Sequence, residues 1–215
     1  MKGSHATVSA FLSTAISLIQ ANSDIVSLHT NGVAYIQEAS ATVVLPELPS
    51  PLSGDVAIWS AIMMNNQASF LQGVTSSSPS GTDSFFVAAG SDPTVGEPVE
   101  ASPGSTVKTH YKLNKGTRLW DQNVYVDGKL VSSVSTSKGQ TGEIFYISIE
   151  CASGNCPDHP AHSWTNVSIV LSNADESFKH AGSWAHGASG GAVSSPDGGR
   201  TWNFDTINVP AQKAE

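Results

Sequence analysis

Apolar and polar residues alternate along much of this chain with the period of two that is typical of β-strands. Over residues 107–113, for example, one face carries Val107 and Tyr111 while the other carries Lys108 and Lys112. A strand with one apolar and one polar face predicts a sheet that buries only one of its sides. The pattern therefore favours antiparallel β-structure over helices.

Similar segments recur along the chain, separated by turn residues. The strand candidates are 55–63, 69–74, 85–88, 107–113, 123–126, 129–131, 143–150, 164–171 and 201–209. Asp127-Gly128, between two of them, is the strongest short signal for a β-hairpin. Strands at this spacing predict an all-β antiparallel sandwich. A length of 215 residues fits one such domain.

The N-terminal part has a different pattern. Residues 1–5 read as an expression-vector remnant, and apolar residues then recur at helical spacing between Val8 and Ile19. This predicts a short amphipathic helix, with a signal-peptide core as the alternative. We therefore divide the chain into an N-terminal helix and connector over 6–50 and a sandwich domain over 51–215.

Charge and the length of apolar runs argue against two classes of partner, nucleic acids and membranes. The chain has 10 Lys and Arg against 18 Asp and Glu, a net charge of −8, and no basic run. A nucleic-acid surface needs clustered cations, and a membrane span needs about 20 apolar residues, so neither is expected. Only 13% of residues are charged, so hydroxyls and amides must make up much of the surface. That composition suits a secreted, acid-exposed protein.

The segment 143–150 carries the most informative polar pattern. Its core-directed residues are Phe145, Ile147 and Ile149, and its other face carries Tyr146, Ser148 and Glu150. A carboxyl group beside a phenol and a hydroxyl can be held by hydrogen bonds and have its pKa shifted, as proton-transfer catalysis requires. The alternative is a solvated glutamate at a strand end.

Five segments together resemble a known family. They are Ile58-Trp59, Phe70-Leu71-Gln72-Gly73, Ser102-Pro103-Gly104-Ser105-Thr106-Val107, Val124-Tyr125-Val126-Asp127-Gly128-Lys129-Leu130-Val131 and Tyr146-Ile147-Ser148-Ile149-Glu150. In this order they resemble the eqolisins, which are fungal glutamic peptidases. The resemblance implies a concanavalin-like sandwich with curved sheets and a peptide-cleaving site on its concave face.

The resemblance also implies roles for individual residues. Gln72 and Glu150 match the catalytic pair, Trp59 matches the substrate-cleft tryptophan, and Tyr146 lies where it would contact substrate. Glu150 would take a proton from the attacking water, and the Gln72 amide would stabilise the oxyanion. We expect the pair on neighbouring strands, on one concave face and a water's reach apart. No metal or cofactor is implied, and the substrate would be a polypeptide cleaved in acid.

Two positions depart from the family pattern. Met63 stands where the family has an acidic residue, or Met64 to Asn65 if a one-residue gap falls there. The segment Phe85-Phe86-Val87-Ala88-Ala89 lacks the family's glutamate and tryptophan. The departures indicate either a different specificity or the alternative function. In that alternative, the same cleft binds or processes a small molecule or a glycan without peptidase activity.

The two cysteines leave three interpretations open. Cys151 and Cys156 lie in a short loop with Gly154 and Pro157, which favours a disulfide. With His159 and His162 the same cysteines have the ligand types of a zinc site. Two free thiols are the third interpretation. In a chain with no other cysteine, we favour the disulfide and expect no metal.

Overall fold

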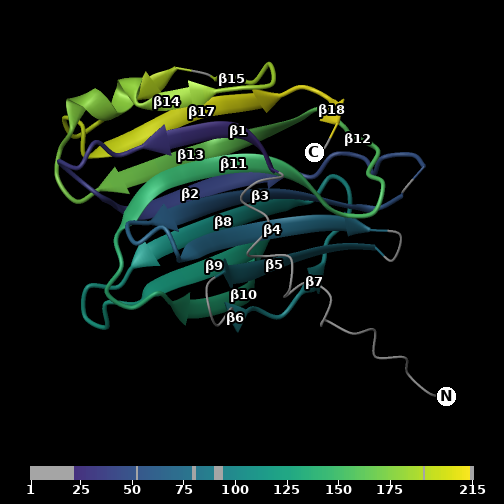
Figure 1. Ribbon diagram of the computed structural model, residues 1–215, viewed down its shortest axis with the longest axis horizontal. Coiled ribbons are helices and arrows are strands. Elements are labelled where there is room, and N and C mark those ends of the chain that lie inside the picture. Colours follow the sequence, from purple (N-terminus) through teal and green to yellow (C-terminus); the bar gives the residue numbers. More distant parts are fainter. Residues whose placement is uncertain (1–21, 52, 79–80, 90–93, 191, 214–215) are drawn as a thin grey trace.

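The computed structural model describes residues 22–213 apart from 52, 79–80, 90–93 and 191 (Figure 1). The expected N-terminal helix, between Val8 and Ile19, lies outside the described residues. The described chain is almost entirely antiparallel β-structure, with one short 3₁₀ helix at Glu176–His180. The all-β fold class is thereby confirmed.

The strands form two layers. The layer that carries the candidate site, the site sheet, contains β14 (Gly182–Trp184), β1 (Asn22–His29), β11 (Gly142–Ser153), β3 (Asp55–Met64), β4 (Phe70–Ser78), β5 (Gly81–Ala89), β6 (Thr94–Val95) and β7 (Val99–Glu100). The second sheet contains β10 (Lys129–Thr136), β9 (Trp120–Val126), β8 (Thr106–Leu113), β2 (Ile36–Val44), β13 (His162–Leu171), β17 (Thr201–Val209), β15 (Ser189–Gly190) and β16 (Val193–Ser194). A separate pair joins β12 (Asp158–His159) to β18 (Gln212–Lys213). The layers meet where Gly142 of β11 pairs with Ile36 of β2.

Most of the expected strands are present, and the expected hairpin joins β9 to β10. Its turn residues, Asp127 and Gly128, have φ values of 49° and 78°, as this type of tight hairpin turn requires. The region 6–50 holds more than the expected connector, because β1 and β2 each pair within a sheet. Sequence reasoning missed these two strands because their alternation is broken by small and polar residues.

The central strand of the site sheet, β3, is buried along its whole length. Its even-numbered residues, such as Ile58 and Ile62, join the main core between the sheets. Its odd-numbered residues, such as Trp59 and Met63, form a second cluster on the opposite face. Burial on both faces explains why 55–63 is a nearly continuous apolar run rather than an alternating one.

Close packing between the sheets requires a glycine next to the candidate site. A Cβ atom added to Gly73 of β4 would overlap the Thr109 methyl group of β8 and lie 3.0 Å from the Tyr111 hydroxyl. That hydroxyl accepts a hydrogen bond from the Gly73 amide at 2.7 Å and donates one to the Ser60 carbonyl at 2.6 Å. Tyr111 therefore ties β8 to both β3 and β4.

We predict that Gly73→Ala destabilises the fold by about 1–3 kcal/mol, because the added methyl group overpacks a closed interface. Urea denaturation would measure this loss. Gly116→Ala is the control, since its nearest atom to an added Cβ is 3.4 Å away and in a side chain. Equal stability of Gly73→Ala and wild type would contradict the packing described.

Candidate active site

The candidate site lies on the face of the site sheet that points away from the second sheet. Three adjacent strands supply its side chains: Asp55, Ala57, Trp59, Ala61 and Met63 from β3, Phe70, Gln72, Val74 and Ser76 from β4, and Tyr146, Ser148 and Glu150 from β11. All four site residues expected from the sequence are on this face. Strand alternation accounts for this, because each occupies the outward parity of its own strand.

The register separates Gln72 from Glu150. These residues are not on neighbouring strands, because β3 lies between β4 and β11 (Figure 1). Gln72 is opposite Ala61, which is opposite Tyr146, whereas Glu150 is opposite Ala57, which is opposite Ser76. The two residues are therefore offset by four positions, about 13 Å along the strands, and by two strand spacings, about 10 Å. The expectation of neighbouring strands is wrong, and this spacing exceeds the reach of one bridging water.

Trp59 contacts Glu150 directly. Its indole Nε1 donates a hydrogen bond to Glu150 Oε2 at 3.0 Å, and its ring packs edge-on against Phe70 with centroids 5.5 Å apart. The indole is only 1% exposed. In this structure Trp59 thus holds the carboxyl group in place rather than forming an open wall of a cleft.

Glu150 is a buried carboxyl group, and one of its two oxygens has no hydrogen-bond partner among the described residues. Its side chain is 3% exposed, and Oε1 accepts no hydrogen bond from the described residues. Burial raises the pKa of Glu150 to about 7; the charge of Asp55 adds to the rise, and the Trp59 hydrogen bond opposes it. The carboxyl group is therefore protonated in acid and gives up its proton near neutrality. The alternative of a solvated strand-end glutamate is wrong.

Sequence reasoning missed Asp55, whose charge acts on Glu150, and Ser76, which contacts Asp55. Asp55 is 5% exposed, and the Ser76 hydroxyl donates a hydrogen bond to its Oδ1. The sequence held a signal for this contact, because the 55–63 strand begins with a lone acidic residue in an apolar run. Pairing it with Ser76 required the register of β3 and β4.

Tyr146 lies at the other end of the face, directly across Ala61 from Gln72. Its ring contacts Phe70 with centroids 6.1 Å apart. Burial raises the pKa of Tyr146, and the charges of Asp24 and Glu143 add to the rise. The phenol is therefore neutral in acid and can donate a hydrogen bond. Gln72 and Tyr146 thus share one row of this face, with Ala61 between them.

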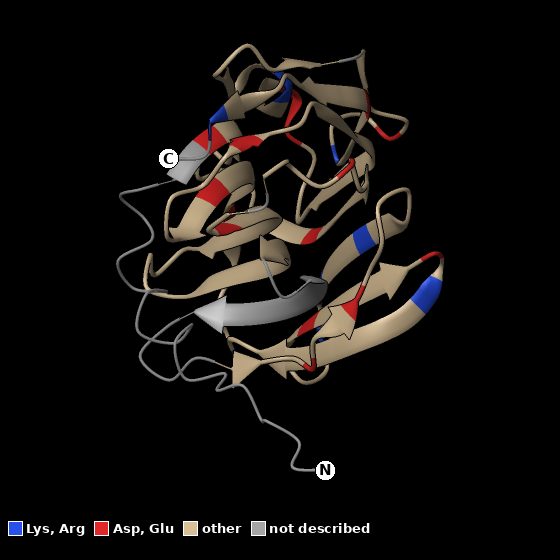
Figure 2. Cartoon of the chain, turned by 90° about the vertical axis from the view of Figure 1, so that its right-hand side faces the viewer, with Lys and Arg blue, Asp and Glu red and all other residues tan. Residues whose placement is uncertain are grey.

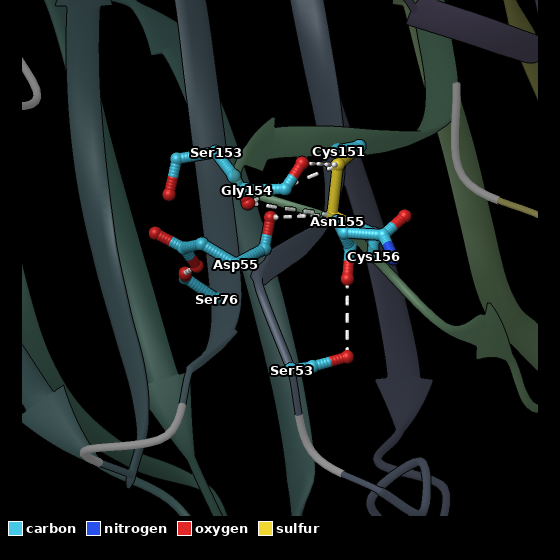
Figure 3. The surroundings of a disulfide bond; sticks show 8 residues. All are labelled: Ser53, Asp55, Ser76, Cys151, Ser153, Gly154, Asn155 and Cys156. Atoms are coloured by element: carbon cyan, nitrogen blue, oxygen red, sulfur yellow. Dashed lines mark hydrogen bonds between the residues drawn. A yellow bond between two sulfur atoms is a disulfide. The ribbon is translucent and has the colours of Figure 1, made fainter.

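Cys151 and Cys156 form the expected disulfide, with an S–S distance of 2.04 Å (Figure 3). Disulfide sulfurs carry no thiolate, so the zinc interpretation loses two of its ligands. His159 and His162 are buried beside each other, with ring centroids 4.9 Å apart, and Nδ1 of each lies within hydrogen-bond distance of the Pro160 carbonyl. Within the described chain, no group of three or more metal-binding side chains occurs.

Figure 2 shows the Lys and Arg residues of the described chain few and dispersed among acidic ones. None of the helices in the described part has the length and apolar character that crossing a bilayer requires.

Comparison with known proteins supports the fold through structure alone. No family model matches the sequence, and no curated protein matches it either. Among solved structures, the chain is similar to scytalido-glutamic peptidase bound to a transition-state analogue inhibitor, with a TM-score of 0.61 and 13% identity over 89% of this chain and 98% of that one. It is also similar to SCP-B, a member of the eqolisin family of peptidases in a complex with the tripeptide Ala-Ile-His, with a TM-score of 0.59 and 12% identity over 88% and 99% of the two chains. The fold is therefore eqolisin-like.

We predict that Glu150 makes stability depend on pH. Its pKa rises from 4.5 in the unfolded chain to about 7 in the folded one, so its contribution is fully present below pH 4.5 and is lost as pH increases toward 7. The loss is on the order of 3 kcal/mol at most. Glu150→Gln cannot ionise and keeps an acceptor for Trp59. The variant should therefore gain stability relative to wild type between pH 4.5 and 7.5.

Urea denaturation of both proteins across this range measures the difference, in which the titration of groups that do not interact with Glu150 cancels. Glu143→Gln, a more exposed glutamate of the same strand, is the control and should show no such gain. A constant difference between Glu150→Gln and wild type would mean that Glu150 has an ordinary pKa.

Proposed function

We propose that this protein is an acid-active endopeptidase of the glutamic type, in which Glu150 exchanges protons with the scissile peptide group. The observation that carries the proposal is the buried Glu150 carboxyl, held by Trp59 through one oxygen and unpartnered among the described residues at the other. Leaving a buried polar atom without a partner costs free energy, and such atoms in native structures often have a functional role. The eqolisin-like fold, whose solved members bind a peptide or a transition-state analogue, supports the reaction class.

The pKa of Glu150 indicates the direction of proton transfer. With a pKa of about 7, the carboxyl group is protonated at acidic pH and starts the reaction as a general acid. The general-base role that the family resemblance implies would require the ionised form at the outset. We therefore assign Glu150 to protonate the substrate carbonyl oxygen first and to accept that proton back as the bond breaks. Since Glu150 is 3% exposed, a substrate must displace the groups that cover it.

Gln72 remains part of the proposed site, with a different role. An extended peptide advances about 3.3 Å per residue, so about five substrate residues would span the diagonal of roughly 16 Å between Glu150 and Gln72. We assign the Gln72 amide to bind the substrate backbone at that distance, with Tyr146 across Ala61 as a second hydrogen-bonding group. Met63, 8% exposed beside Phe70, gives this end an apolar surface where the family has an acid. The side chains of residues 85–89 lie outside those described.

The proposed setting is extracellular. A disulfide forms and persists in oxidising compartments, and the Cys151–Cys156 bond fits secretion into an acidic medium.

We predict that the protein cleaves denatured protein substrates at about pH 2–5 and that the rate declines as pH rises through about 7, because Glu150 loses its proton. Glu150→Gln should lower kcat by at least about 10²-fold while the protein stays folded. Proteolysis of a fluorogenic casein, with circular dichroism as the check on folding, measures both. Glu143→Gln should cleave at the wild-type rate. Wild-type protein that digests nothing from pH 2 to 7 would favour the alternative, a binding or small-molecule function.

A second prediction distinguishes the two roles for Gln72. If Gln72 binds the substrate backbone at a distance, Gln72→Ala should raise KM for peptides long enough to reach residue 72 and leave kcat nearly unchanged. If Gln72 is instead an oxyanion donor, the same substitution should lower kcat by about 10²–10³-fold. Steady-state kinetics on peptides of graded length separate these outcomes. A loss confined to kcat would show that Gln72 reaches the reacting carbonyl and that our assignment is wrong.

A further inference from the structure

We infer that Asp55 is the second reacting carboxyl group of this site, which accepts the proton of the attacking water while Glu150 donates one to the substrate. This inference rests on the proposed function and extends it. It replaces the expected glutamine–glutamate pair with an aspartate–glutamate pair. The argument comes from register, burial and contacts around β3.

The strand register brings the two carboxyl groups together. Glu150 lies opposite Ala57, and Asp55 is two residues before Ala57 on the same face of β3. On the other side of Ala57 lies Ser76, whose hydroxyl donates to Asp55 Oδ1. The side chain between Glu150 and Ser76 in this row is the methyl group of Ala57, which is 3% exposed. A diagonal pair on a sheet lies within reach of long side chains, and the charge of Asp55 indeed acts on Glu150.

The disulfide loop holds the backbone of both Asp55 and Glu150 in position. Cys151 directly follows Glu150, and Cys156 Sγ lies 3.4 Å from the Asp55 carbonyl oxygen (Figure 3). Next to Asp55, a Cβ on Gly54 would lie 2.9 Å from the Ser153 carbonyl oxygen, so the loop packs tightly against the start of β3. The loop therefore couples the end of β11 to the beginning of β3 through covalent and packing contacts.

A structural role alone does not account for this arrangement. A buried Ser–Asp hydrogen bond is common and by itself stabilises a sheet. Placing a second carboxyl group beside it is unfavourable, because two buried carboxyl groups disfavour ionisation of each other. Glu150 also keeps Oε1 unpartnered among the described residues. Two carboxyl groups with different surroundings, one hydrogen-bonded by a hydroxyl and one held by an indole, are what an acid–base pair requires.

The proton transfers balance over one cycle. The water oxygen bonds to the carbonyl carbon while a water proton moves to the Asp55 carboxylate and the Glu150 proton moves to the carbonyl oxygen, which yields a neutral gem-diol. Asp55 then protonates the amide nitrogen, the C–N bond breaks, and a gem-diol hydroxyl returns its proton to Glu150. The products are a carboxylic acid and an amine, and both side chains regain their starting protonation states.

The decisive experiment is Asp55→Asn, which keeps the shape of the side chain and removes its base. We expect kcat on the casein substrate to fall by about 10²–10⁴-fold with KM within about threefold of wild type. The pKa of Glu150, followed by carboxyl-carbon NMR, should also decrease from about 7 toward its ordinary value because a neighbouring negative charge is lost. Asp121→Asn is the matched control. It removes a carboxyl group that likewise accepts a serine hydrogen bond, from Ser135, but lies on β9 of the second sheet, and it should change neither quantity.

Each outcome decides a different question. Active wild type with an equally active Asp55→Asn overturns the Asp55 assignment and leaves the proposed peptidase intact. Inactive wild type overturns both. If Asp55→Asn does not fold, Ser76→Ala replaces it. Loss of the hydroxyl donor should move the acid-side limb of the kcat–pH profile to higher pH, and an unmoved limb would overturn the assignment.

Discussion

The register of β3 between β11 and β4 determines which side chains of the site can meet. Side chains on a sheet alternate with a period of two, so each residue of β11 faces one position of β3 and, beyond it, one position of β4. Glu150 thereby shares a row with Ala57 and Ser76, and Tyr146 shares one with Ala61 and Gln72. Burial of both faces of β3 makes this register costly to change, because a slip of one residue would exchange the main core with the site face. The chemistry of the site follows from these rows.

The carboxyl group of Glu150 connects the site to the stability of the fold. Its burial raises the pKa to about 7, which keeps the group neutral at the acidic pH where the proposed reaction runs. The same burial disfavours the folded state when the group ionises near neutrality. A carboxyl group of this kind therefore contributes most to the stability of the fold in acid. The low content of charged residues, 13%, agrees with the same environment.

The family resemblance of the sequence implies one reacting pair, and the pair that we propose from the local geometry is a different one. At 13% identity the likeness concerns the fold alone, and fold does not determine function. Gln72 has the strand position that the family resemblance implies, yet the residue across from it is Tyr146. Asp55 and Ser76 are instead the polar neighbours of Glu150. If Glu150 reacts together with Asp55 in place of Gln72, hydrolysis in acid would be preserved although the supporting residues differ. Met63 is one such difference, because it stands where the family has an acidic residue.

The sequence by itself determined the fold class, most strands, the β9–β10 hairpin, the disulfide and the face on which Gln72, Trp59, Tyr146 and Glu150 lie. These are local properties, since alternation, turn residues and short loops act within about ten residues. It did not reveal β1 and β2, whose patterns are weak, nor the separation of Gln72 from Glu150. Strand order and register depend on contacts between segments distant in the chain. Asp55 and Glu150 are separated by 95 positions in the printed numbering, and only tertiary structure places Glu150 opposite Ala57, diagonal to Asp55, and removes both carboxyl groups from water.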